Sequence, residues 1–179
     1  MKSLNFLIFK SDNNKDGYLL VELIVAISLL TVGFLGFLGL ISRSISLNSV
    51  ISDQFVANYL ASEGIEVVKN LIDANVIQKR PWNDGFGNEK CYEVDYKTMN
   101  ISEATETNCP SNSVNSIRFD SSTGVYSYAV GNPVKFYRTV HITPVSNDEI
   151  KVNSVVKWVG RGSIKNEINL EDHFFNWRL

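Results

Sequence analysis

The sequence is poor in cysteine and proline, and it has no marked excess of charge of either sign. Its two cysteines, Cys91 and Cys109, form no CxxC motif and have no spacing typical of a metal cluster, so we expect no metal and no cofactor. The 17 basic and 19 acidic side chains nearly balance, so charge does not favour a nucleic-acid partner. No serine lies in a nucleophile elbow, and no glycine loop resembles a phosphate cradle. The sequence therefore does not predict an enzyme.

What the chain does have is one long apolar run from Tyr18 to Ile41. At about 1.5 Å per helical residue, a helix over 18–42 is long enough to cross a hydrocarbon core of about 30 Å. The run exceeds the apolar stretch of about 7–15 residues in a secretory signal peptide, and no polar stripe marks it as a soluble core helix. Glu22 lies inside it, although a carboxylate in a bilayer costs about 2.5–3.5 kcal/mol. The sequence thus predicts a single membrane span with one charge that needs an explanation.

The short segment before the span carries slightly more lysine than aspartate. That excess favours a cytoplasmic N-terminus and an extracytoplasmic location for the polar remainder of the chain. Disulfides persist in such oxidising places, so we expect Cys91 and Cys109 to be bonded to each other. The alternative is a pair of small buried thiols that do not meet.

The helical pattern continues beyond the span. Apolar residues recur at spacings of three and four from Ile45 to Leu71, and no proline follows before Pro81. This pattern predicts one helix from Tyr18 to about Gln78, apolar all round in its first half and on one side only in its second half. Such a second half needs a partner surface, for which the rest of the chain is the natural candidate.

After Pro81 the period of the pattern changes. Short segments rich in Val, Ile, Tyr and Phe alternate with turn residues, and they are CYEVDYKTM, SIRFD, GVYSYAVG, VKFYRTVHITPV, IKVNSVVKWVG and SIKNEINL. We expect a meander of antiparallel strands with one face on the amphipathic helix, which makes the fold class α+β. His141 is better explained as a structural residue of a strand than as a catalytic base, and His173, in EDHFFNW, as a packing or surface residue.

The stretch GYLLVELIVAISLL, which begins at Gly17, resembles the class III leader of type IV pilins and pseudopilins. The resemblance implies that a prepilin peptidase cuts between Gly17 and Tyr18 and that the new N-terminus at Tyr18 is methylated. Glu22 then stands at the fifth mature position. In a filament its carboxylate would face the α-amine of Tyr18 of a neighbouring subunit, so that two costly charges neutralise each other.

Some positions depart from the family pattern. Tyr18 replaces the usual Phe, Asp16 stands where a basic residue is common, and Gly39 occupies the position of a helix-bending proline in many major pilins. Gly33, Gly36 and Gly39 either soften the helix, since each costs about 1 kcal/mol relative to Ala, or allow close packing of helices. Both interpretations remain open.

Two further stretches, ANYLASEGIEVVKNLIDAN and VVKWVGRGSIKNEINLEDHFFNW, are similar to PilV-type minor pilins and I-type pseudopilins. The resemblance implies a leader over 1–17, a membrane and filament-core helix over 18–42, an amphipathic continuation over 43–79 and a β-rich extracytoplasmic head over 80–179. Some pseudopilins bind calcium, but the turn DSSTG that begins at Asp120 has too few oxygen ligands by itself.

The resemblance also implies a function. It is that of a minor pilin or pseudopilin, a structural or assembly-priming subunit of a type IV pilus or a type II secretion-like filament. The implied partners are the prepilin peptidase/methyltransferase, other pilins or pseudopilins, the inner-membrane assembly platform and, before assembly, membrane lipid. The implied location is the inner membrane as a single-pass protein, and then a cell-surface or periplasmic filament. The alternative is a membrane-anchored extracytoplasmic binding domain that is unrelated to filaments.

Overall fold

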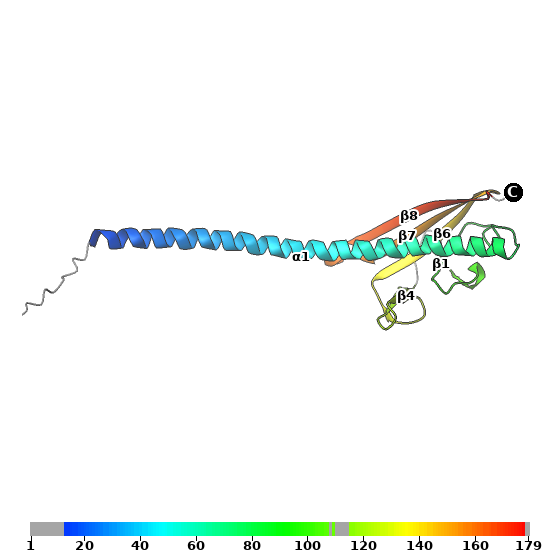
Figure 1. Ribbon diagram of the computed structural model, residues 1–179, viewed down its shortest axis with the longest axis horizontal. Coiled ribbons are helices and arrows are strands. Elements are labelled where there is room, and N and C mark those ends of the chain that lie inside the picture. The colour runs from blue at the N-terminus through cyan, green and yellow to red at the C-terminus, as the bar shows by residue number, and fades with distance from the viewer. Residues whose placement is uncertain (1–12, 108, 110–114, 178–179) are drawn as a thin grey trace, which may run out of the picture. The chain divides into compact units, whose positions relative to one another are not determined.

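The structure is a computed structural model that describes residues 13–107, 109 and 115–177 (Figure 1). Contacts divide the chain into two compact units, residues 1–49 and residues 50–179. Most of the expected leader, residues 1–12, lies outside the described part of the chain.

The first element is the helix α1, Asn13–Ile77, of 65 residues. The predicted helix from Tyr18 to about Gln78 is confirmed, although α1 begins five residues earlier than expected. It ends where Lys79 adopts a left-handed conformation with φ 57°. There the Arg80 N–H donates to the Asn75 carbonyl over 2.9 Å and the Lys79 N–H donates to the Val76 carbonyl over 3.0 Å. These two bonds satisfy carbonyls at the end of the helix, as in a Schellman motif, and Pro81 follows directly.

The second unit contains a five-stranded sheet in the order β2-β1-β6-β7-β8, with every neighbouring pair antiparallel. Its strands are β1 Lys90–Glu93, β2 Thr105–Thr107, β6 Phe136–Ser146, β7 Glu149–Val159 and β8 Lys165–Phe175. Figure 1 shows the three long strands beside the C-terminal part of α1. The predicted α+β fold, a long helix packed on a C-terminal antiparallel sheet, is confirmed.

A smaller sheet of three strands has the order β4-β3-β5. It comprises β3 Arg118–Asp120, β4 Val125–Ser127 and β5 Asn132–Pro133. Two short 3-10 helices, η1 Ile101–Glu103 and η2 Arg161–Ser163, complete the described elements.

The core of the second unit lies between α1 and the larger sheet. The strand β7 alternates between buried and half-buried residues over most of its length, so that one face of the sheet lies on the helix. The buried apolar side chains of the helix side run from Ala57 to Ile72, and those of the sheet side include Val140, Ile142, Val152 and Val156. Burial of this apolar surface is the main force that holds the head on the helix.

At Gly64, α1 approaches the sheet closely. A Cβ atom at this position would lie 2.4 Å from Ser154 Oγ and 3.0 Å from Val140 Cγ2. The sequence SEGIE therefore places its glycine where only a hydrogen atom fits.

Several strands differ in extent from the prediction; GVYSYAVG, for example, is a strand only over Val125–Ser127. The predicted strand CYEVDYKTM ends early, at Glu93, because Asp95 forms a turn: its carboxylate accepts from the Lys97 N–H, and its own N–H donates to Thr98 Oγ1. The strand β8 continues beyond Leu170 to Phe175, because its register with β7 extends from Lys165 opposite Val159 to Phe175 opposite Glu149. The polar run EDHFF is therefore part of the sheet.

Candidate functional site

The apolar surface of α1 between Tyr18 and Ile41 is the first candidate site. None of its most apolar stretch is buried by the described residues, and its large apolar side chains are between 40% and 75% exposed. By length and composition this helix can cross a membrane once. A continuous apolar surface of this kind needs cover from lipid or from other protein.

Glu22 is the single charged residue between Tyr18 and Ser42. The polar side chains nearby are satisfied within the helix, since the hydroxyl of Ser28 donates to the Ile24 carbonyl over 2.7 Å and that of Thr31 to the Ile27 carbonyl over 2.6 Å. Among the side chains that the structure describes, no cation pairs with Glu22. Its carboxylate is exposed on the apolar surface and is therefore available to a group from outside the chain.

The expected processing position lies inside α1. Gly17 and Tyr18 are both helical, and Tyr18 is 75% exposed. Because Tyr18 and Glu22 are four residues apart, they lie on one face of the helix. The structure thus places the residue that would carry the new α-amine one turn from the carboxylate.

The three glycines of the span lie in unbroken helix. A Cβ at Gly33, Gly36 or Gly39 would meet nothing within 4 Å among the described residues. The fold itself does not require glycine at these positions.

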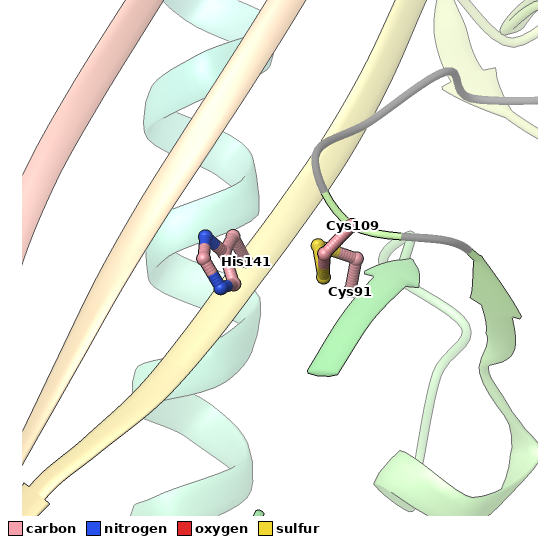
Figure 2. Close-up of side chains that lie close together, drawn as sticks. All are labelled: Cys91, Cys109 and His141. Carbon is pink, nitrogen blue, oxygen red and sulfur yellow. A yellow bond between two sulfur atoms is a disulfide. The ribbon is translucent and has the colours of Figure 1, made fainter. Parts of the chain in front are cut away.

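The second candidate site is in the head, where Cys91, Cys109 and His141 come together (Figure 2). A disulfide joins Cys91 to Cys109 with an S–S distance of 2.02 Å. Cys91 is on β1, Cys109 is in the segment between β2 and β3, and His141 is on β6 directly opposite Cys91 in the strand register. The potential ligand atoms of the three residues lie within 4.8 Å of one another. Cys91 is buried, whereas Cys109 is exposed.

A carboxylate holds the imidazole of His141. Its Nε2 atom lies 2.8 Å from Glu89 Oε1 and 3.3 Å from Thr143 Oγ1. Sequence reasoning treated His141 and the cysteines separately, because His141 is far from both cysteines in the sequence and only the pairing of β1 with β6 makes them neighbours. Alternation along the strands gives each residue its face, but it does not give the register of the pairing.

The outer face of the large sheet carries opposite charges in pairs across β7 and β8. The Nζ atom of Lys157 lies 3.6 Å from Oε2 of Glu167, and that of Lys151 lies 3.8 Å from Oε2 of Glu171. His173 Nδ1 lies 2.6 Å from Glu149 Oε1, and hydrogen bonds to Glu149 and Glu171 raise the pKa of His173 above its ordinary value. These side chains neutralise one another, and their arrangement offers no nucleophile with an activating base.

The sequence analysis did not predict one buried arginine, Arg138. Arg138 on β6 is 1% exposed, and its guanidinium lies 3.0 Å from the carboxylate of Glu63 on α1. It donates to the Leu60 carbonyl over 2.8 Å and also to the Val94 carbonyl. The only signal in the sequence is position, since Arg138 alternates in phase with Phe136 and Val140 on the apolar face of the strand.

Tyr128 belongs to the same buried cluster. Its hydroxyl donates to the Arg138 carbonyl over 2.9 Å, and burial raises the pKa of Tyr128 to about 12. The cluster of Glu63, Arg138 and Tyr128 joins α1, the loop before β5 and β6. It is a structural tie between the helix and the head, not a reactive site.

Comparison of the chain with protein-family models, with curated proteins and with solved structures finds no match. Evidence on function therefore comes from the chain's own residues and from their arrangement.

Proposed function

We propose that this chain is a minor pilin or pseudopilin, a subunit that enters or primes a type IV pilus or a type II secretion-like filament. One observation carries the proposal: a single helix, α1, begins with an exposed apolar half containing one carboxylate and continues into a half that packs on an antiparallel sheet. The stretch from Gly17, with Glu22 as the fifth residue after it, adds the leader pattern.

The exposed half of α1 has a use at both stages of such a pathway. In the membrane, lipid covers the side chains from Tyr18 to Ile41. In a filament, the same side chains of neighbouring subunits cover one another, and the open space beside Gly33, Gly36 and Gly39 lets helices approach closely. The subunit would thus move from lipid to protein without exposing apolar surface to water.

Glu22 also gains a role in this proposal. After cleavage, Tyr18 carries a positive α-amine, and this group on an adjoining subunit would neutralise the carboxylate of Glu22. A charge pair in an apolar surrounding is far less costly than either charge alone. The partners are the prepilin peptidase/methyltransferase, other pilins or pseudopilins and the inner-membrane assembly platform.

Processing of the leader tests the proposal. In cells that contain the prepilin peptidase, mass spectrometry of the membrane-extracted protein should show that residues 1–17 have been removed and that Tyr18 is methylated. Gly17→Val should block the cut, because a β-branched side chain crowds the peptidase at the scissile bond. Gly33→Val is the matched control: it makes the same change inside the span, where a side chain meets nothing in the chain, and it should leave processing intact.

A wild-type N-terminus at Met1 in such cells would contradict the filament proposal. It would favour the alternative of a membrane-anchored extracytoplasmic binding domain, which keeps its first 17 residues.

A further inference from the structure

We propose that Cys91, Cys109 and His141 form a binding site for a borderline-soft divalent cation such as Zn²⁺ when the two cysteines are in their dithiol form. The disulfide and the metal would then be alternative links between β1 and the segment at Cys109. This inference does not depend on the proposed function, because it concerns the chemistry of the head alone.

The geometry supplies three ligand atoms of the right kind. In a tetrahedral zinc site, with Zn–S of about 2.3 Å and Zn–N of about 2.0 Å, neighbouring ligand atoms lie about 3.5–4 Å apart. The ligand atoms of Cys91, Cys109 and His141 already lie within 4.8 Å of one another. In the disulfide the two sulfur atoms are 2.02 Å apart. After reduction they would therefore separate by about 1.7 Å to reach the spacing of a tetrahedral site, with the fourth position left for water.

Two of the three ligands stand on regular structure. Cys91 and His141 face each other across the pairing of β1 with β6, and the ladder continues on both sides through Lys90 opposite Ile142 and Tyr92 opposite Val140. Their backbones are held by the sheet and not by the disulfide. Figure 2 shows the three residues in the disulfide form. Because the pairing of the strands places His141 opposite Cys91, reduction should free Cys109 but leave Cys91 and His141 as neighbours.

Glu89 prepares the imidazole for this task. Its carboxylate oxygen lies 2.8 Å from His141 Nε2. Metal-binding histidines typically donate one ring N–H to a carboxylate, which fixes the tautomer and makes the other nitrogen a better ligand. With the Nε2 proton donated to Glu89, the lone pair of the imidazole is on Nδ1, which would be the nitrogen offered to the cation.

Binding of the cation by the dithiol form changes no oxidation state. Two S–H bonds break, two metal–sulfur bonds form, two protons pass to solvent, and His141 contributes a lone pair. The disulfide form has no thiolate to offer, so it should not bind the cation at this site. To convert it to the dithiol form, a phosphine supplies two electrons in the experiment, and water supplies the two thiol protons and the oxygen atom of the phosphine oxide.

Titration with Co²⁺ tests the proposal, because thiolate ligation gives this ion a charge-transfer absorption and tetrahedral geometry gives it visible bands. The full chain in detergent is reduced with a phosphine, desalted without oxygen and titrated with Co²⁺ alone; Zn²⁺ is then added in competition. We expect one Co²⁺ per reduced chain with thiolate absorption, displaced by Zn²⁺, and no such absorption from the disulfide form.

Variants assign the ligands. His141→Gln should weaken Co²⁺ binding at least about tenfold, as loss of a coordinating or orienting group typically does. His173→Gln is the matched control, because His173 also lies beside carboxylates, Glu149 and Glu171, but is not grouped with any sulfur atom. It should leave Co²⁺ binding unchanged.

Three outcomes would overturn the proposal. They are the absence of thiolate absorption in the reduced wild type, equal affinity in His141→Gln and wild type, and a reduced head that unfolds, by near-ultraviolet circular dichroism, and does not refold when Co²⁺ is added. Refolding on addition of Co²⁺ would support it.

Discussion

At the scale of single residues, Arg138 shows how a charge can be held inside this head. A buried ion pair adds little net stability compared with an apolar substitute, but removal of one partner leaves the other charge without compensation. The guanidinium of Arg138 is compensated by three acceptors, which are the carboxylate of Glu63 and the carbonyls of Leu60 and Val94. These acceptors lie on α1 and on the loop after β1, so one side chain orients three parts of the second unit.

Arg138→Met should therefore lower the free energy of unfolding of the head by about 3 kcal/mol, because Glu63 and the buried carbonyls lose their donor. Denaturant unfolding of the chain in detergent, followed by tryptophan fluorescence, measures the effect. Arg118→Met is the matched control, since Arg118 is exposed and, among the residues that the structure describes, donates to the Gly131 carbonyl alone, over 3.2 Å. It should change stability by less than about 0.5 kcal/mol. A loss below about 1 kcal/mol for Arg138→Met would show that the cluster is not a structural tie.

At the scale of elements, long patterns were predictable and pairings were not. Absence of proline and the spacing of apolar residues predicted α1 to within one residue at its C-terminal end, since tens of residues contribute to that signal. The strands β6 and β7, of 11 residues each, were predicted from their content of Val, Ile, Tyr and Phe and from the turn residues beside them. The strands β2 and β5, of three and two residues, have no pattern long enough to read.

The candidate sites divide in the same way. Glu22 could be singled out from the sequence because a charge in an apolar run is a local anomaly. The proximity of His141 to the cysteines depends on the register of β1 with β6, and that of Arg138 to Glu63 depends on which turn of α1 meets β6. Both are properties of packing between distant segments, which periodicity alone does not contain.

The contact between α1 and β7 yields a prediction at this scale. Gly64→Ala should destabilise the head by about 1–3 kcal/mol, because the added methyl group would lie 2.4 Å from Ser154 Oγ and 3.0 Å from Val140 Cγ2. Ser154→Ala should be neutral or slightly stabilising, since its buried hydroxyl has no hydrogen-bond partner in the described part of the chain. The double variant should recover part of the loss.

A double-mutant cycle from denaturant unfolding measures this coupling. Gly87→Ala serves as control, because a Cβ there meets nothing within 4 Å and the change should leave the head's stability nearly unaltered. Strict additivity of Gly64→Ala and Ser154→Ala would show that the helix and the sheet yield at this contact.

At the scale of the whole molecule, the chain combines two surfaces with opposite needs. From Ala57 to Asn75 one face of α1 is buried within the chain itself, whereas from Tyr18 to Ile41 the apolar side chains of the same helix are exposed, with no cover from the residues that the structure describes. The apolar side chains from Tyr18 to Ile41 need to be covered by lipid or by other subunits. The second unit thus has a buried core of its own, whereas the apolar part of α1 needs a covering surface from outside the described chain.

Substitutions at Glu22 test whether the apolar part of α1 is surrounded by other subunits as well as by lipid. Glu22→Val should leave cleavage and membrane insertion intact, because the span becomes more apolar. It should reduce the share of the protein in filaments, since the α-amine of Tyr18 on an adjoining subunit would lose its counter-charge in an apolar setting. Glu22→Gln should be intermediate or equally poor, as an amide can accept a hydrogen bond but carries no charge. A subunit found only at the filament tip would show a milder defect, because no subunit is recruited above it.

The measurement is the amount of each variant in sheared filaments relative to the amount in membranes. A Glu22→Val protein that is processed and enters filaments at the wild-type ratio would show that the carboxylate is not an assembly contact.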